Sequence, residues 1–115
     1  MAAQQPVAVG PYTVGGGNPL LWICGPCVIE SHDLTMRVAE ALRGYADRLA
    51  LPLVFKASFD KANRSSGKSF RGPGMEGGLK ILESVRKEIG VPVITDVHDI
   101  PEIAPVAAVV DVIQT

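Results

Sequence analysis

The sequence predicts an α/β fold, specifically the first half of a (β/α)8 TIM-type barrel preceded by a short N-terminal β-hairpin. Short apolar segments alternate with longer ones in which apolar residues recur at helical spacing, which is typical of parallel strands joined by right-handed crossovers. Polar, reactive side chains follow each apolar segment, as they do at the carboxyl ends of barrel strands; an open doubly wound sheet instead concentrates its ligand contacts at one switch point. Because only four core strands are expected, the chain accounts for half of a barrel.

The first 23 residues are expected to form a hairpin that leads into the first barrel strand. Apolar residues in segments 7–14 and 20–23 flank the run Gly15-Gly16-Gly17-Asn18. This pattern predicts two short strands joined by a glycine turn. Residues 24–115 are then expected to supply the first βα units, so that residues 1–115 make a single, partial domain.

Local signals mark the ends of the expected helices. Ser31 is a suitable N-cap for the first helix, Gly90 stands in the usual stop position after the second, and Asp99 caps the third, with Pro101 in its first turn. In chain order, the expected elements are a helix over 32–50, a strand over 53–57, a helix with apolar positions from 79 to 89, a strand over 91–97, a helix over 103–109 and a strand over 111–114.

The composition limits the classes of function. A net charge of −1 gives the whole molecule no field that would recruit nucleic acid or a membrane surface. The hydrophobic fraction of 47% and the charged fraction of 20% are typical of a globular protein. No apolar run reaches the ~18 residues of a spanning helix, and the first residues lack a signal-peptide pattern. A cytoplasmic protein is therefore expected.

Residues 55–71 form a basic, hydroxyl-rich segment behind the apolar stretch 53–55. The segment contains five cations, one Asn and four Ser residues. Phosphate oxygens accept several hydrogen bonds at once, and Lys, Arg and hydroxyl groups supply them. A solvated surface loop has a similar composition, but all three Phe residues of the chain lie here, which favours a loop anchored to a core. The candidate anion-binding residues are Lys56, Lys61, Asn63, Arg64, Ser65, Ser66, Lys68, Ser69 and Arg71.

The quartet Cys24-Gly25-Pro26-Cys27 has the spacing of a thioredoxin-like redox motif. In that chemistry the thiolate is stabilised by a helix that begins at the motif. Here the expected helix begins only after Ser31, and Glu30 opposes thiolate formation. A thiol-disulfide oxidoreductase is therefore kept as an alternative, and Cys24 is interpreted as a small buried residue at a strand end.

Five segments together resemble 3-deoxy-D-manno-octulosonate 8-phosphate synthases. They are Gly25-Pro26-Cys27-Val28-Ile29-Glu30-Ser31, the run from Phe55 to Ser66, Phe70-Arg71-Gly72-Pro73-Gly74, Thr95-Asp96-Val97-His98 and Asp111-Val112-Ile113-Gln114. Related 3-deoxy-heptulosonate phosphate synthases share the Gly-Pro-Cys element but usually carry a Lys-Pro-Arg-Thr type segment in place of residues 56–66. The resemblance implies a transferase, generally a homotetrameric TIM barrel. Such enzymes condense phosphoenolpyruvate with D-arabinose 5-phosphate for lipopolysaccharide (KDO) biosynthesis and release phosphate.

The resemblance also implies roles for individual residues. Lys56 and Lys61 match contacts to phosphoenolpyruvate, which Ser58 and Gln114 assist. Asp96 matches a rim residue close to the reacting centre and is, with Lys56, the catalytic candidate; a structural hydrogen-bond acceptor is the alternative. The residues that match the arabinose 5-phosphate segment are Asn63, Arg64 and Ser65, and Arg71 is either a ligand contact or an ion-pair partner that holds the loop.

Cys27 occupies the position at which metal-dependent members of the family carry Cys and metal-independent members carry Asn. The resemblance therefore implies a divalent metal, Zn²⁺, Fe²⁺ or Mn²⁺, with Cys27 as one ligand. The remaining His, Glu and Asp ligands belong to the second half of the family's barrel. His98 is accordingly interpreted as a rim residue rather than a ligand.

The chain also departs from the family pattern. The family usually continues after Ile-Gln with an apolar segment and an Arg-Gln pair, whereas Gln114 is followed here only by Thr115; Gly67-Lys68 replaces Ile-His. A half-barrel exposes strand edges and apolar faces, so the isolated chain is expected to be inactive and poorly folded. A non-catalytic phosphate-binding module is the second alternative.

Overall fold

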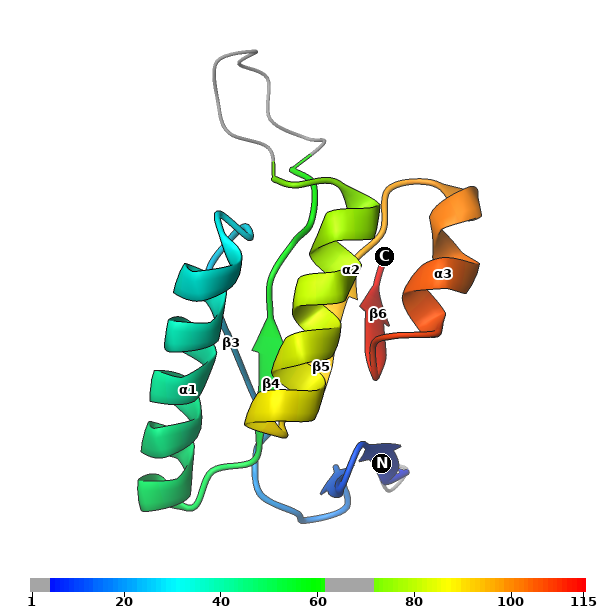
Figure 1. The fold of residues 1–115 in the computed structure, drawn as a ribbon. Coiled ribbons are helices and arrows are strands. Elements are labelled where there is room, and N and C mark those ends of the chain that lie inside the picture. The colour runs from blue at the N-terminus through cyan, green and yellow to red at the C-terminus, as the bar shows by residue number, and fades with distance from the viewer. Residues whose placement is uncertain (1–4, 62–71) are drawn as a thin grey trace.

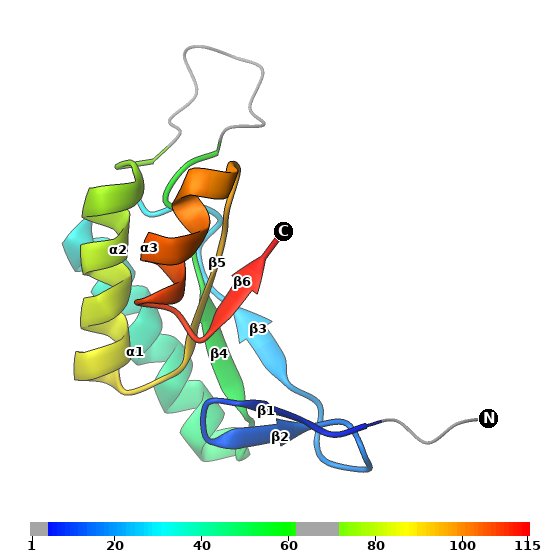
Figure 2. The ribbon, with the colours of Figure 1, turned by 90° about the vertical axis from the view of Figure 1, so that its right-hand side faces the viewer.

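The computed structural model describes residues 5–61 and 72–115. In chain order the elements are β1 (Val7–Val9), β2 (Tyr12–Val14), β3 (Trp22–Cys24), α1 (His32–Leu49), β4 (Leu53–Lys56), α2 (Met75–Ser84), η1 (Val85–Ile89), β5 (Val93–Asp96), η2 (Ile100–Glu102), α3 (Ile103–Ala107) and β6 (Val112–Gln114). Helices α1, α2 and α3 all lie on one face of a sheet, as Figures 1 and 2 show.

Strands β3 to β6 form a parallel sheet whose spatial order, β3-β4-β5-β6, is the order of the chain. A doubly wound sheet reverses its strand order at the switch point, whereas a barrel adds each new strand on the same side. The prediction of an α/β fold that corresponds to the first half of a (β/α)8 barrel is therefore confirmed. Within the described ranges, β3 and β6 are the two edge strands.

The predicted hairpin is present, but its boundaries were wrong. Strands β1 and β2 pair antiparallel with Val7 opposite Val14, so the turn lies at Gly10-Pro11 and not at 15–18. Gly10 has a φ of +55°, the conformation that a two-residue hairpin turn requires at its first central position. The glycine run forms the connection to the barrel, closed by a 2.7 Å hydrogen bond from Asn18 Nδ2 to the Gly15 carbonyl. Segment 20–23 therefore leads into the parallel sheet.

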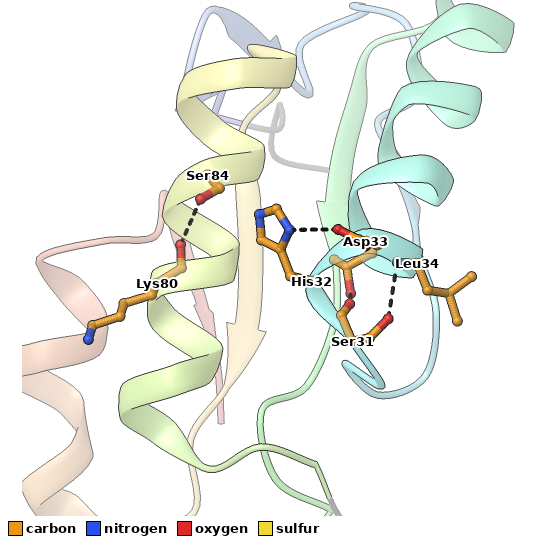
Figure 3. A network of polar contacts seen from close by, with 7 residues as sticks. Ser31, His32, Asp33, Leu34, Lys80 and Ser84 are labelled. Atoms are coloured by element: carbon orange, nitrogen blue, oxygen red, sulfur yellow. Dashed lines mark hydrogen bonds and ion pairs between the residues drawn. The ribbon is translucent and has the colours of Figure 1, made fainter.

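The predicted helix boundaries follow from local capping groups. The Ser31 hydroxyl accepts a hydrogen bond from the Leu34 amide at 3.1 Å, at the start of α1, as Figure 3 shows. The second helix continues from α2 through the π-helical segment η1 and stops at Gly90, whose φ is 79°. Asp99 and Glu102 form a capping box at the third helix, which starts with the 3-10 turn η2.

The core lies between the sheet and the helices. Phe55 and Phe59 are almost completely buried, which confirms that the start of the basic segment is anchored; Phe70 lies outside the described residues. A Cβ at Gly78 would stand 2.3 Å from the Cβ of Phe59, so only glycine lets α2 pack this closely on Phe59. The segment behind β4 is therefore held against α2.

The opposite face of the sheet carries a second row of side chains. Because side chains alternate along a strand, Lys56 and Ile94 share one face, and Asp96 and Gln114 follow on it towards the carboxyl ends. Figure 2 shows no helix on this face within the described part of the chain. None of the described helices is long and apolar enough to cross a lipid bilayer.

Candidate functional site

The carboxyl ends of the parallel strands bring polar residues to one rim. Cys24 ends β3, Lys56 ends β4, Asp96 ends β5 and Gln114 ends β6. Parallel strands end at the same edge of a sheet, so residues distant in sequence become neighbours there. The strand ends thus meet at one rim. Lys56, Asp96 and Gln114 lie there on the face that the described helices leave open, whereas Cys24 is in register with Phe55 and packs against the core.

A cavity of about 350 Å³ joins the cysteine quartet to the basic segment. Its volume lies within the ~300–1,000 Å³ typical of small-molecule sites. The lining residues are Ile23, Cys24, Gly25, Pro26, Cys27, Lys56 and Lys61. Two motifs that are separate in the sequence therefore form one site.

The two lysines give the cavity its chemistry. Lys56 and Lys61 are both half-buried and line the same cavity from the end of β4 and the segment behind it. Two ammonium groups at one cavity favour a ligand with more than one negative charge, such as a phosphate ester.

Gly25 allows the cysteine turn to pack against β4. A Cβ at Gly25 would lie only 1.7 Å from the main-chain oxygen of Lys56. The turn is also tied to residue 58, because the Ile29 amide donates to the Ser58 carbonyl at 3.0 Å and the Ser58 amide donates to the Cys27 carbonyl at 3.4 Å. No signal in the sequence predicts this close approach, because a glycine in a Cys-Gly-Pro-Cys quartet is equally consistent with a turn and with a backbone contact.

Ser58 is joined to Asp96 at the rim. Its side chain is fully buried, and its hydroxyl donates a 2.5 Å hydrogen bond to Oδ1 of Asp96. Its predicted contact with substrate stays a prediction. The bond shows that Asp96 does serve as an acceptor for a structural donor, the alternative that the sequence left open.

Asp96 also contacts His98. The distance from His98 Nε2 to Asp96 Oδ2 is 3.6 Å, and the two side chains are 23% and 18% exposed. The His98 ring packs edge-on against Phe59, with ring centroids 6.0 Å apart. The His98 amide donates to Oε1 of Glu102 at 2.7 Å, which fixes the start of the loop behind β5.

Gln114 ends the edge strand β6. It is exposed and lies in register with Asp96, and its carbonyl accepts a 3.1 Å hydrogen bond from the Val97 amide. The side chains of Asp96 and Gln114 therefore lie on the same face of the sheet. The backbone of Gln114 holds the rim together, and its exposed side chain is free to meet a ligand.

Cys27 presents an exposed thiol at the cavity, whereas Cys24 is half-buried and packs against the core. In residues 5–61 and 72–115, no three His, Cys, Asp or Glu residues group as a metal site would require. One soft thiolate fits Zn²⁺ or Fe²⁺ as a single ligand, but the other donors have to come from elsewhere. Helix α1 begins at His32, well beyond Cys27, so the helix terminus is not at the thiol as in thioredoxin-like proteins.

Several predicted residues lie outside the described ranges. They are Asn63, Arg64, Ser65 and Arg71, together with the other candidate anion-binding residues of segment 62–71.

Comparison with known proteins gives consistent matches. Residues 3–115 match the DAHP synthetase I family. The chain is 58% identical over 104 residues to the 2-dehydro-3-deoxyphosphooctonate aldolase of Bordetella pertussis (strain Tohama I), covering 90% of this chain and 36% of that protein. It is 59% identical over 104 residues to the enzyme of the same name from Cupriavidus taiwanensis, with 90% and 36% covered. For the Geotalea uraniireducens enzyme the identity is 53% over 108 residues, with 94% and 40% covered. The chain thus spans 36% to 40% of the length of these curated relatives.

Proposed function

The chain belongs to the DAHP synthetase I family, and from this we propose that it is the substrate-binding part of a 2-dehydro-3-deoxyphosphooctonate aldolase. The 2-dehydro-3-deoxyphosphooctonate in this enzyme's name is the same compound as the 3-deoxy-D-manno-octulosonate 8-phosphate that the sequence motifs indicate as the product. The proposed reaction condenses phosphoenolpyruvate with D-arabinose 5-phosphate in KDO biosynthesis and releases phosphate. The names of the curated relatives support this activity. Since the chain covers little more than a third of their length, the activity is proposed for the complete barrel.

One observation carries the proposal: Lys56 and Lys61 line the same cavity as the Gly25-Pro26-Cys27 turn. Phosphoenolpyruvate carries a carboxylate and a phosphate close together, and two ammonium groups neutralise them. Once this charge is neutralised, the electron-rich C3 approaches the aldehyde carbon of the pentose phosphate. The π electrons of the C2–C3 double bond form the new carbon–carbon bond, and the aldehyde oxygen takes up a proton to become a hydroxyl. One water is consumed as phosphate leaves C2, which becomes the ketone carbon of the product. The proposed role of Asp96 is to orient the aldehyde, its hydroxyls or water.

We further propose that Cys27 supplies one ligand to a divalent metal, Zn²⁺, Fe²⁺ or Mn²⁺. The exposed thiol at the cavity supports this assignment. A bound divalent ion would act as a Lewis acid at a substrate oxygen. The other ligands would come from the part of the barrel that this chain does not contain. A homotetrameric, cytoplasmic enzyme is proposed on the family resemblance.

The test is a chimera in which this chain replaces the matching segment of the Bordetella pertussis enzyme. Phosphate release that depends on arabinose 5-phosphate is expected for the chimera and is expected to be lost in its Lys56→Ala variant. The proposal is contradicted if the chimera is folded but inactive while the unmodified parent enzyme is active in the same assay. If that chimera still binds phosphoenolpyruvate, the phosphate-binding module is favoured instead.

The redox alternative has its own assay. Insulin reduction that persists in Lys56→Ala and disappears in Cys24→Ser would establish a thiol-disulfide oxidoreductase. Because α1 begins only at His32, we expect no such activity.

A further inference from the structure

Three side chains from two adjacent strand ends form a polar array at the rim. Ser58 follows β4, Asp96 ends β5, and His98 lies two residues beyond it. The Ser58 hydroxyl donates to Oδ1 of Asp96 at 2.5 Å, and His98 Nε2 lies 3.6 Å from Oδ2. Each oxygen of the carboxylate therefore has its own neighbour.

We propose that Ser58 is a positioning residue, which holds the Asp96 carboxylate in one orientation and does not itself contact substrate; His98 supports the second oxygen. This inference rests on the proposed function, because it assigns Asp96 a role at the reacting centre. The terminal torsion of an Asp side chain is broad, so a carboxylate without fixed partners samples a range of orientations. The hydrogen bond from Ser58 fixes one oxygen, and the His98 ring, 3.6 Å from the other, limits the space into which the carboxylate can turn before substrate binds.

The burial of Ser58 favours this role over substrate binding. Its side chain is fully buried, so its hydroxyl faces protein rather than the open rim. A serine hydroxyl can donate one hydrogen bond, and that hydrogen bond goes to Asp96. To bind an anionic ligand, Ser58 would have to break this bond and leave a part-buried carboxylate oxygen without its donor.

The hydroxyl is not needed to hold the two strand ends together. The buried Thr95 hydroxyl donates a 2.7 Å hydrogen bond to the Ala57 carbonyl, which joins the same two ends independently. The main chain of Ser58 is bonded to Cys27 and Ile29 and keeps those bonds when the side chain is shortened. Ser58→Ala therefore removes the partner of Asp96 and leaves the local fold in place.

The experiment compares Ser58→Ala, Asp96→Asn and the double variant in the Bordetella pertussis chimera. For Ser58→Ala we expect kcat to fall about tenfold or more, with KM for phosphoenolpyruvate within about twofold of the parent value, because the proposed defect is one of orientation. In the Asp96→Asn background, removal of the Ser58 hydroxyl is expected to lower kcat no further. Thr95→Val is the matched control, which is expected to lower the melting temperature while it leaves kcat within about twofold.

Two outcomes overturn the inference. A Ser58→Ala variant whose KM for phosphoenolpyruvate rises more than about fivefold, with kcat unchanged, makes Ser58 a substrate contact. If the two substitutions lower kcat additively, so that Ser58→Ala reduces it as much in the Asp96→Asn background as in the parent chimera, Ser58 does not act through Asp96.

A readout independent of turnover separates this inference from the proposed function. In a crystal structure of the Ser58→Ala chimera, an Asp96 carboxylate that is rotated or occupies two orientations supports the positioning role, and an unchanged carboxylate contradicts it. The orientation of the Asp96 carboxylate can be read from the crystal structure even if the chimera is inactive. Inactivity would then contradict the proposed function and leave the positioning role of Ser58 to be judged by the structure.

Discussion

The main-chain oxygen of Lys56 lies where a side chain on Gly25 would have to go. A Cβ added at Gly25 would stand 1.7 Å from this oxygen and 2.7 Å from the carbonyl carbon. Because both atoms belong to the backbone of a central strand, they cannot move aside as a flexible side chain would. This contact places the cysteine turn directly on β4, and the cavity between them depends on it.

Gly25→Ala is therefore expected to push the turn away from β4. The backbone clash should lower the free energy of unfolding by about 2–4 kcal/mol and reduce activity of the chimera more than tenfold. Urea denaturation and phosphate release measure the two effects. Gly44→Ala is the control, because a Cβ there meets nothing within 4 Å; in helix α1 it should stabilise the protein by up to about 1 kcal/mol. Equal stability of the two variants would contradict the prediction.

Lys56→Ala is expected to weaken phosphoenolpyruvate binding by tenfold or more. The reason is that Lys56 is half-buried and is one of the two described cations that line the cavity. Isothermal titration calorimetry on the chimera measures the affinity directly. Lys80→Ala removes an exposed lysine of α2 that pairs only loosely with Glu76, at 3.8 Å, and is expected to leave the affinity unchanged. Equal losses in both variants would indicate a general effect of net charge instead.

Substitution of Cys27 is expected to remove bound metal from the chimera. Both cysteines line the cavity, but Cys27 is exposed whereas Cys24 is half-buried and packs against the core, so Cys27 is the expected ligand. Elemental analysis after dialysis should show a substoichiometric metal content for Cys27→Ala and an unchanged content for Cys24→Ala. Retention of metal by Cys27→Ala would exclude the thiolate as a necessary ligand.

The 115-residue chain alone is expected to lack a cooperatively packed fold. Both edge strands are open in the described sheet, and Trp22 of β3 is 46% exposed beside a small apolar cavity of about 90 Å³ that includes Leu42 and Tyr45. Such surfaces favour non-specific association. We expect binding of a hydrophobic dye and a broad thermal transition for the chain alone.

The single tryptophan provides a direct probe of barrel completion. When 5-fluorotryptophan is incorporated at Trp22 and the remaining segment of the Bordetella pertussis enzyme is added as a separate chain, the fluorine resonance should move and sharpen as the open edge is covered. A sharp transition for the chain alone, with no response to the added segment, would show that it folds independently.

Local sequence signals determined most of the secondary structure. Ser31, Gly90 and Asp99 mark helix ends through groups within a few residues of themselves, so a sequence can reveal them. The hairpin shows the limit of such signals. Gly10-Pro11 and the glycine run at 15–17 both have turn-forming residues, and the choice between them depends on which strands pair.

The sequence by itself determined the α/β alternation, the caps and the types of residue that meet at the rim. Only the tertiary structure decided that Gly25 packs on Lys56 and that the Ser58 hydroxyl donates a hydrogen bond to Asp96, which lies 38 positions further along the chain. The physical reason is that capping and periodicity are short-range properties of the chain. Contacts between neighbouring parallel strands, in contrast, depend on a register that is set by the packing of the whole sheet against its helices.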